Sequence, residues 1–340
     1  MKKLNGGIVM IVVVIATIVA IGFWSSHSKT KERPEVVPVK ISIGVITQPP
    51  AALIMVAKDK GFFTEQGLDV ELKEFTAGKL ALQALLAGSL DFSISADVPV
   101  ALAALQGNKI VVPAQVIKQA TNTIRIVARK DGNITDAKEY FISKKRKLAT
   151  SIGGGPELFT YQFLNKLGVD KNRVEIISQQ PQDMPAALAN GSVDAIAIFD
   201  PAAYIAETQM GDKGITFTDS SIYSEKYILD APESVKQNSN NLEKVLRALI
   251  EAEQYVKNNP DEAKNIVSKY TKLDKPALDK FWSNYDFQVV LTKQLADSFN
   301  QEVQWAKDTG KESSSTLNPD FSQIIYGIPL QKISSAAVEL

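Results

Sequence analysis

The sequence predicts an α/β protein made of two similar lobes, with a helical extension towards its C-terminal end. Strand-like and helix-like segments alternate from residue 39 onward, which is typical of βαβ units around a largely parallel sheet. One segment recurs further along the chain, and the last third changes to helical periodicity. At 340 residues the chain has the length of about two domains.

The recurring segment indicates an internal duplication. Residues 84–91 read ALLAGSLD and residues 187–194 read ALANGSVD, so each matched position lies 103 residues further on. At the same offset Thr47 falls opposite Thr150, at the ends of two predicted strands. A register kept across several elements predicts two lobes of one architecture with a cleft between them.

The individual elements follow from apolar β-branched runs for strands and from apolar residues at three- and four-residue spacing for helices. The first half is expected to contain strand 40–46, helix 51–60, strand 68–75, helix 77–87, strand 91–95, helix 98–105 and strand 110–116. The second half contains strand 124–128, strand 147–150, helix 156–167, strand 173–178, helix 184–189, strand 193–198 and a helix from about residue 201. Beyond residue 218 nearly all helix is expected, at 241–258, 261–270, 275–282 and 292–307.

The composition excludes several classes of function. The formal net charge is zero and no long basic or acidic block is present, so we expect no nucleic-acid partner. Cysteine is absent, which excludes disulfides, thiolate metal sites and a lipid-modified N-terminal cysteine. His27 is the one histidine, so the commonest catalytic bases and nucleophiles are missing. We therefore predict no catalytic residues, no metal and no cofactor.

Residues 8–24 form an uncharged apolar run that follows Lys2 and Lys3. As a helix the run spans roughly 25 Å, at the short edge of what crosses a bilayer. The pattern predicts a signal peptide or an uncleaved signal anchor in the inner membrane, and the length of the run favours the anchor. In either case we expect the rest of the chain to be periplasmic or otherwise extracytoplasmic, after a linker at residues 25–38.

Candidate binding residues follow from strand ends. Ligands of open α/β sheets bind beyond the carboxyl ends of the strands, which selects residues 47–50, 76–78, 95–97, 151–156, 179–183 and 199–201. Within these stretches and the expected hinge we predict as ligand-binding residues Gln48, Thr76, Ser95, Asp97, Asn122, Ser151, Gly153, Gly154, Gly155 and Asp200.

The glycines before Pro156 would let backbone N–H groups at a helix start hold an anionic head group. Each candidate has a plainer alternative that stays open here. The glycine run is also compatible with a simple turn, and Asp97 and Asp200 with ordinary N-caps. Arg125 and Arg173 are candidates for a cation in the cleft by position alone.

Four stretches carry a resemblance to a known family: residues 57–70 (AKDKGFFTEQGLDV), 84–91, 187–201 and 258–263 (NNPDEA). Over residues 40–310 the chain resembles periplasmic solute-binding proteins of the nitrate, aliphatic sulfonate, taurine and thiamine-precursor type. The resemblance implies the type II periplasmic binding protein fold, two Rossmann-like lobes with a hinge. The chain would cross between lobes near 120–123 and 218–227. Lobe 1 would comprise 39–121 and 222–310 and lobe 2 would comprise 122–221, leaving 1–38 as signal segment plus linker and 311–340 as an irregular tail.

The leading hypothesis is a monomeric receptor that captures a small anion or zwitterion by hinge closure and delivers it to the permease subunits of an ABC importer. The main alternative is a membrane-tethered lobe that senses a ligand, which an uncleaved anchor would favour. An enzyme of the same fold is a third possibility, and it would depend on carboxylates such as Asp97 and Asp200 alone.

Overall fold

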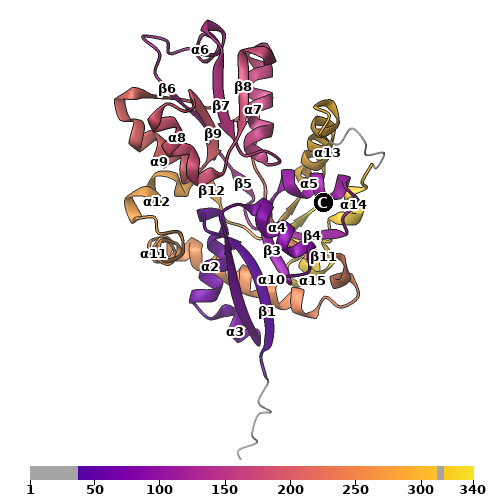
Figure 1. Ribbon diagram of the computed structural model, residues 1–340. Coiled ribbons are helices and arrows are strands. Elements are labelled where there is room, and N and C mark those ends of the chain that lie inside the picture. The colour runs from indigo at the N-terminus through magenta and orange to yellow at the C-terminus, as the bar shows by residue number, and fades with distance from the viewer. Residues whose placement is uncertain (1–36, 312–317) are drawn as a thin grey trace, which may run out of the picture. The chain divides into compact units, whose positions relative to one another are not determined.

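The computed structural model describes residues 37–311 and 318–340, so the predicted membrane segment at 8–24 and most of the linker lie outside the described residues. From Pro38 to Leu340 the chain forms one compact unit. Two five-stranded sheets organise this unit, and we call the part built on each sheet a lobe (Figure 1). No helix among the described residues combines the length and the apolar character that a membrane crossing requires.

The sheet of lobe 1 has the strand order β2-β1-β3-β11-β4. Its strands are β2 (Leu68–Phe75), β1 (Val39–Ile46), β3 (Phe92–Ala96), β11 (Tyr227–Pro232) and β4 (Ile110–Gln115). The first three are parallel, whereas β11 runs antiparallel to both β3 and β4. The carboxyl ends of β1, β2 and β3 therefore share one edge of the lobe.

The sheet of lobe 2 repeats this order as β8-β7-β9-β6-β10. Its strands are β8 (Val174–Ser178), β7 (Arg146–Thr150), β9 (Ala195–Phe199), β6 (Ile124–Arg129) and β10 (Gly214–Phe217). Here β6 is the antiparallel strand, paired with β9 and β10. In each lobe the antiparallel strand is the one that the chain forms directly after crossing from the other lobe. The residue boundaries predicted for the lobes stay a prediction.

The duplication extends to individual hydrogen bonds. Asp91 Oδ2 accepts the backbone N–H of Ser42 at 2.7 Å, and Asp194 Oδ2 accepts that of Lys147 at 2.8 Å. Asp91, just before β3, is thus bonded to β1, and Asp194, just before β9, is bonded to β7. The preceding helices α4 (Gly78–Leu86) and α8 (Met184–Asn190) each lead into a glycine with positive φ.

The register of the first strands corrects one sequence match. Phe92 and Ala195 are 103 residues apart, but their partners Ile43 on β1 and Leu148 on β7 are 105 apart. The predicted equivalence of Thr47 and Thr150 is therefore wrong by two residues, because the chain between the paired positions is two residues shorter in lobe 2 than in lobe 1.

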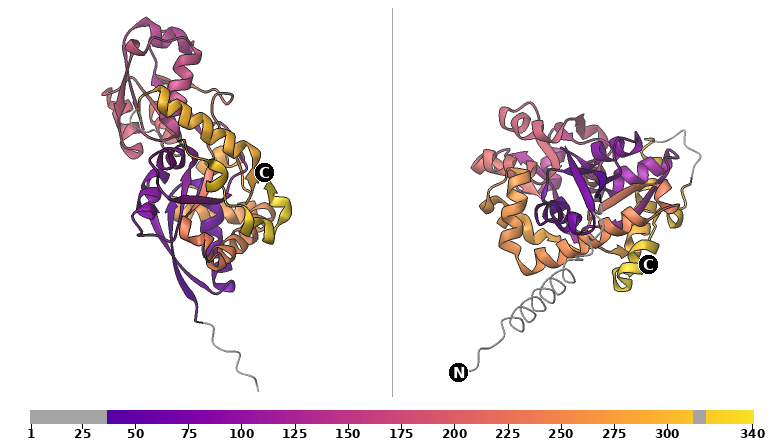
Figure 2. Two further views of the ribbon diagram at one scale, coloured as in Figure 1. Left: turned by 90° about the vertical axis from the view of Figure 1, so that its right-hand side faces the viewer. Right: turned by 90° about the horizontal axis from the view of Figure 1, so that it is seen from below.

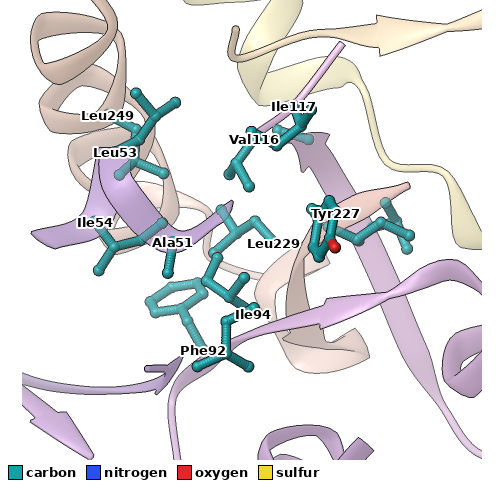
Figure 3. Packing of buried hydrophobic residues seen from close by; sticks show 14 of the residues in the cluster. Ala51, Leu53, Ile54, Phe92, Ile94, Val116, Ile117, Tyr227, Leu229 and Leu249 are labelled. Carbon is teal, nitrogen blue, oxygen red and sulfur yellow. The ribbon is translucent and has the colours of Figure 1, made fainter. Parts of the chain in front are cut away.

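Helices cover both sheets (Figure 1). Lobe 2 has α6 (Ala137–Ser143), α7 (Gly155–Lys166), α8 and α9 (Ala202–Met210). Lobe 1 has α2 (Ala52–Asp59), α3 (Phe62–Glu65), α4, α5 (Asp97–Leu105), α10 (Asn240–Asn258), α11 (Pro260–Thr271), α12 (Lys275–Phe281) and α13 (Lys293–Asp308). In the core of lobe 1, Leu53 of α2 faces Leu249 of α10, and Leu229 of β11 lies close to Ile94 of β3 (Figure 3).

Two expectations for the C-terminal third are corrected. The stretch beyond residue 218 is not nearly all helix, because it contains the buried strand β11. The tail is not irregular throughout: α14 (Phe321–Ile324) and α15 (Ile328–Ile333) bury Phe321 and Leu330, and β14 (Val338–Glu339) pairs with β13 (Leu291–Thr292). In Figure 2 this yellow segment lies against lobe 1.

Candidate functional site

A cavity of about 300 Å³ lies between the lobes. Thr47, Gln48 and Thr76 line it from lobe 1, where they follow the ends of β1 and β2. Phe199 and Pro201 line it from lobe 2 at the end of β9. The cavity therefore lies beyond the carboxyl ends of strands from both sheets, where the strand-end rule places a ligand.

Two hydrogen bonds join the loops on the lobe 1 side of the cavity. Gln48 Nε2 donates to the carbonyl oxygen of Thr76 at 2.9 Å, and the backbone N–H of Thr47 donates to the carbonyl of Phe75 at 3.0 Å. These bonds fix the two loops that follow β1 and β2 relative to each other. The lining offers amides and hydroxyls, and none of its residues carries an ionisable side chain.

The predicted glycine run lies at the start of α7, and it contacts the other lobe. Lys79 of α4 donates through Nζ to the carbonyl of Ile152 at 3.1 Å, next to Gly153, whose φ is +77°. The N–H of Gly153 donates to Glu157 Oε2 at 2.8 Å. One of the backbone N–H groups that we expected to bind an anion is thus already hydrogen-bonded to a side chain of α7. Ser151 and Gly154 precede the helix and are half-buried.

Asp97 lies in the interior at the first position of α5 and is fully buried. It accepts hydrogen bonds from the N–H of Val98 at 3.0 Å, from the N–H of Lys226 at 3.1 Å and from the hydroxyl of Tyr223. Burial raises the pKa of Asp97, and these hydrogen bonds only partly offset the effect. The bond from Val98 comes from the next residue, and the N-cap of α5 is Ala96, so Asp97 is not the N-cap of the plainer alternative.

Ser95 is also fully buried, and its hydroxyl lies 3.5 Å from the carbonyl of Ala96. Neither Ser95 nor Asp97 lines the cavity described above. The strand-end rule correctly places Ser95 and Asp97 at the carboxyl edge of the sheet, but it does not show that side chains from other parts of the chain cover them.

Asp200 forms an ion pair inside lobe 2. Its two oxygens accept hydrogen bonds from Arg125 at 2.8 and 2.9 Å, and Arg125 also binds Glu207 at 2.7 Å. Burial raises the pKa of Asp200, and the hydrogen bonds from Arg125 offset part of this effect. Arg125 is therefore engaged by two carboxylates and does not offer a free cation to a ligand.

Asn122 lines a different cavity, of about 410 Å³, together with Arg125, Tyr204 and Lys280. Its φ of 51° places it in the left-handed region, which asparagine tolerates better than most residues. The structure thus brings Gln48 and Thr76 into one cavity and gathers the glycines at α7, whereas Ser95, Asp97, Asn122 and Asp200 lie apart from that cavity. A direct contact of any of these residues with a ligand stays a prediction.

Several residues of the interlobe region were missed by sequence reasoning. Tyr223 and Glu225 lie in the second crossing and approach Gly155 of α7, and Glu302 of α13 approaches Asp97. The crossing has no periodic pattern that would single them out. Within residues 37–311 and 318–340, no cluster of histidine and acidic side chains has the arrangement to hold a metal ion.

Comparisons with known proteins define the family. Residues 48–263 match the NMT1/THI5-like family. The chain is 27% identical over 292 residues to a putative aliphatic sulfonates-binding protein of Bacillus subtilis, covering 84% of this chain and 83% of that protein. It is 26% identical over 317 residues to the taurine-binding periplasmic protein of Escherichia coli, covering 84% and 91%.

The fold has solved counterparts. The crystal structure of the periplasmic aliphatic sulphonate binding protein of Escherichia coli superimposes with a TM-score of 0.72 at 20% identity, covering 85% of this chain and 98% of that one. The type II periplasmic binding protein fold, with its two lobes, is therefore confirmed.

These matches place the chain in a class of binding proteins rather than enzymes. It belongs to the NMT1/THI5-like family, as a solute-binding protein of an ABC import system. The family resemblance inferred from the sequence motifs is thereby confirmed.

Proposed function

We propose that this protein acts outside the cytoplasm as a monomer that captures a small anionic or zwitterionic solute of the sulfonate, taurine, nitrate or thiamine-precursor type. Hinge closure traps the solute between the lobes, and the closed form delivers it to the permease of an ABC importer. The observation that carries the proposal is the cavity of about 300 Å³ lined from strand ends of both lobes. Its size is at the lower end of ordinary ligand pockets, as expected for a small solute.

The contacts between the lobes are of a kind that a hinge motion can form and break. Leu158 of α7 in lobe 2 packs into the hydrophobic core of lobe 1, and Ala77 of lobe 1 packs into the core of lobe 2. Lys79 bonds across the lobes to Ile152. Two short crossings connect the lobes, between β4 and β6 and between β10 and β11. Rotation at these crossings would open the cavity to solvent.

The solute class is supported by the lining and by the relatives. Glutamine amides and threonine hydroxyls donate hydrogen bonds without bringing a counter-charge, which suits an oxyanion or a zwitterion. The relatives named above bind aliphatic sulfonates and taurine, by their names.

The test is a thermal-shift and calorimetric screen with nitrate, taurine, alkyl sulfonates, aromatic sulfonates and thiamine pyrimidines. We expect at least one of these classes to raise the melting temperature and to bind at one site per chain. If none of them binds, the proposed solute class is wrong.

A matched pair of variants tests the site. Ile205 lines the cavity and is 38% exposed, whereas Ile142 on α6 is 42% exposed and does not line it. Ile205→Trp should fill the cavity and weaken binding of the solute found in the screen, and Ile142→Trp should leave binding unchanged. Equal affinity of the two variants would remove the cavity as the binding site.

A further inference from the structure

Three carboxyl groups lie together in the interior where the lobes meet. Asp97 of α5, Glu302 of α13 and Glu225 of the second crossing are 0, 2 and 4% exposed. Glu302 faces Asp97, and neither of its oxygens has an N–H or O–H partner among the described residues. Two carboxyl groups in contact repel each other when both are ionised and form a hydrogen bond when one holds a proton.

The groups around the cluster do not supply matching positive charge. Lys226 is the cation that acts on Asp97 and Glu302, and it is half-buried. The titratable side chains that interact with the three carboxyls are Tyr223 and Lys226 in the crossing, Tyr227 on β11 and Tyr285 on β12. Lys79 on α4 and Glu157 on α7 belong to helices that pack against α5. Lys79 bonds instead to Ile152, and Glu157 pairs with Lys311 at 2.5 Å.

Lobe 2 covers this cluster through the start of α7. A side chain added at Gly155 would place its Cβ 2.9 Å from Glu225 Oε1 and 2.9 Å from the hydroxyl of Tyr223. One turn along, Leu158 enters the core of lobe 1. Separation of the lobes would therefore remove the α7 backbone from Glu225 and admit water to the carboxyls.

We propose that closure of lobe 2 over lobe 1 takes up protons at the cluster of Asp97, Glu225 and Glu302, so that acid pH favours the closed state and alkaline pH favours the open state. The proposal rests on the hinge closure proposed above and adds a proton as a second ligand of the closed form.

The sign follows from burial. Burial raises the pKa of Glu225 from 4.5 to about 8 and raises the pKa of Glu302 and of Asp97 as well. A carboxyl whose pKa is higher in the closed state binds its proton more tightly there, so closure is penalised increasingly as the pH rises above the open-state value. Each proton taken up changes the closing constant by up to about tenfold per pH unit.

The experiment measures the distance between the lobes in the full chain without solute. Because the sequence has no cysteine, spin labels at Glu71→Cys on β2 and Lys138→Cys on α6 report one distance distribution by pulsed electron paramagnetic resonance. From pH 5 to pH 9 we expect the population of the closed distance to fall. An unchanged distribution over this range would overturn the proposal.

Two variants assign the effect. Glu302→Gln and Glu225→Gln replace an ionisable carboxyl by a neutral amide of the same shape, and each should retain more of the closed population at pH 9. Glu65→Gln on the exposed surface of α3 is the matched control and should follow the unmodified protein. If both cluster variants keep the full pH response while circular dichroism shows them folded, the cluster is not the cause.

These outcomes are separable from failure of the proposed function. Absence of any bound solute in the screen with an intact pH response would contradict the solute class and leave the proton-linked closure standing. Solute binding with a pH-independent lobe distance would contradict the proton-linked closure and leave the solute class standing.

Discussion

The buried ion pair of lobe 2 gives the sharpest stability prediction. Arg125 is 11% exposed at its side chain, Asp200 is 0% exposed and Glu207 is 30% exposed. Arg125→Met keeps much of the side-chain volume and removes the guanidinium from both carboxylates. Asp200 would then remain as a buried carboxyl without a partner, whereas Glu207 is able to turn towards water.

The magnitude follows from these exposures. Breaking a buried pair by removing one partner costs about 3–5 kcal/mol, and loss of a partly exposed pair such as that with Glu207 adds less than about 1 kcal/mol. We therefore expect Arg125→Met to lower the free energy of unfolding by about 4 kcal/mol at pH 8. Because burial already raises the pKa of Asp200, loss of Arg125 raises it further. Protonation of Asp200 then reduces the penalty as the pH falls towards 5.

The assay is urea unfolding followed by circular dichroism at pH 5 and pH 8. Arg129→Met is the matched control, because Arg129 ends the same strand β6 and donates to the backbone carbonyls of Leu188 and Ala189. It should cost about 1–2 kcal/mol without the pH dependence. The double variant Arg125→Met/Asp200→Asn should recover most of the loss. If it recovers nothing, or if both arginine variants lose the same amount, the reasoning from an uncompensated buried carboxylate is refuted.

Three further predictions follow from the contacts described above. Asp91→Ala and Asp194→Ala should each lower the free energy of unfolding by about 1–2 kcal/mol in urea titration, and an effect in one lobe alone would contradict their equivalence. Gly155→Leu should weaken solute binding roughly tenfold or more in calorimetry with little change in melting temperature, and unchanged affinity would show that α7 need not approach the second crossing. Asp230→Asn should raise the melting temperature more at pH 9 than at pH 5. Burial raises the pKa of Asp230 from 3.8 to about 8, so its ionisation penalises the folded state increasingly over that interval. An equal rise in melting temperature at both pH values would contradict the raised pKa of Asp230.

Much of the fold was predictable because local patterns determine it. The helix predicted at 241–258 is α10 at Asn240–Asn258, whose apolar residues Leu242, Leu246 and Leu249 recur at helical spacing and are buried. The matched Gly-Ser-x-Asp pieces were informative because each Asp makes the same backbone contact in its own lobe. The spacing between each Asp and the strand that it joins is nevertheless not kept: it is 49 residues from Ser42 to Asp91 and 47 from Lys147 to Asp194.

The strand β11 shows where pattern reading fails. Its sequence, YILDAP, interrupts an apolar run with Asp230 and ends in Pro232, both of which argue against a central strand. In the structure Asp230 is fully buried and accepts a hydrogen bond from Ser93 Oγ at 3.1 Å. The partner comes from β3, more than a hundred residues earlier, so no local window contains the reason for this strand.

The site was less predictable than the fold for the same reason. Strand ends locate an edge, and that rule led to Gln48 and Thr76, which line the cavity. Whether a charged side chain at that edge is available depends on its pairing partners. Asp200 is paired by Arg125 within lobe 2, and Asp97 is covered by Tyr223 from the second crossing. These partners come from parts of the chain that only the folded topology brings together.

This pairing has a consequence for how the cleft selects its solute. The cavity lining carries no ionisable group, and prolines at 49, 50, 181 and 201 remove backbone N–H donors from the helix starts around it. An anion in this cavity would therefore be held by side-chain amides and hydroxyls such as those of Gln48 and Thr76, and not by a salt bridge. Neutral donors bind in fixed directions and over short range, so shape and hydrogen-bond geometry, more than net charge, would decide which solute the lobes close upon.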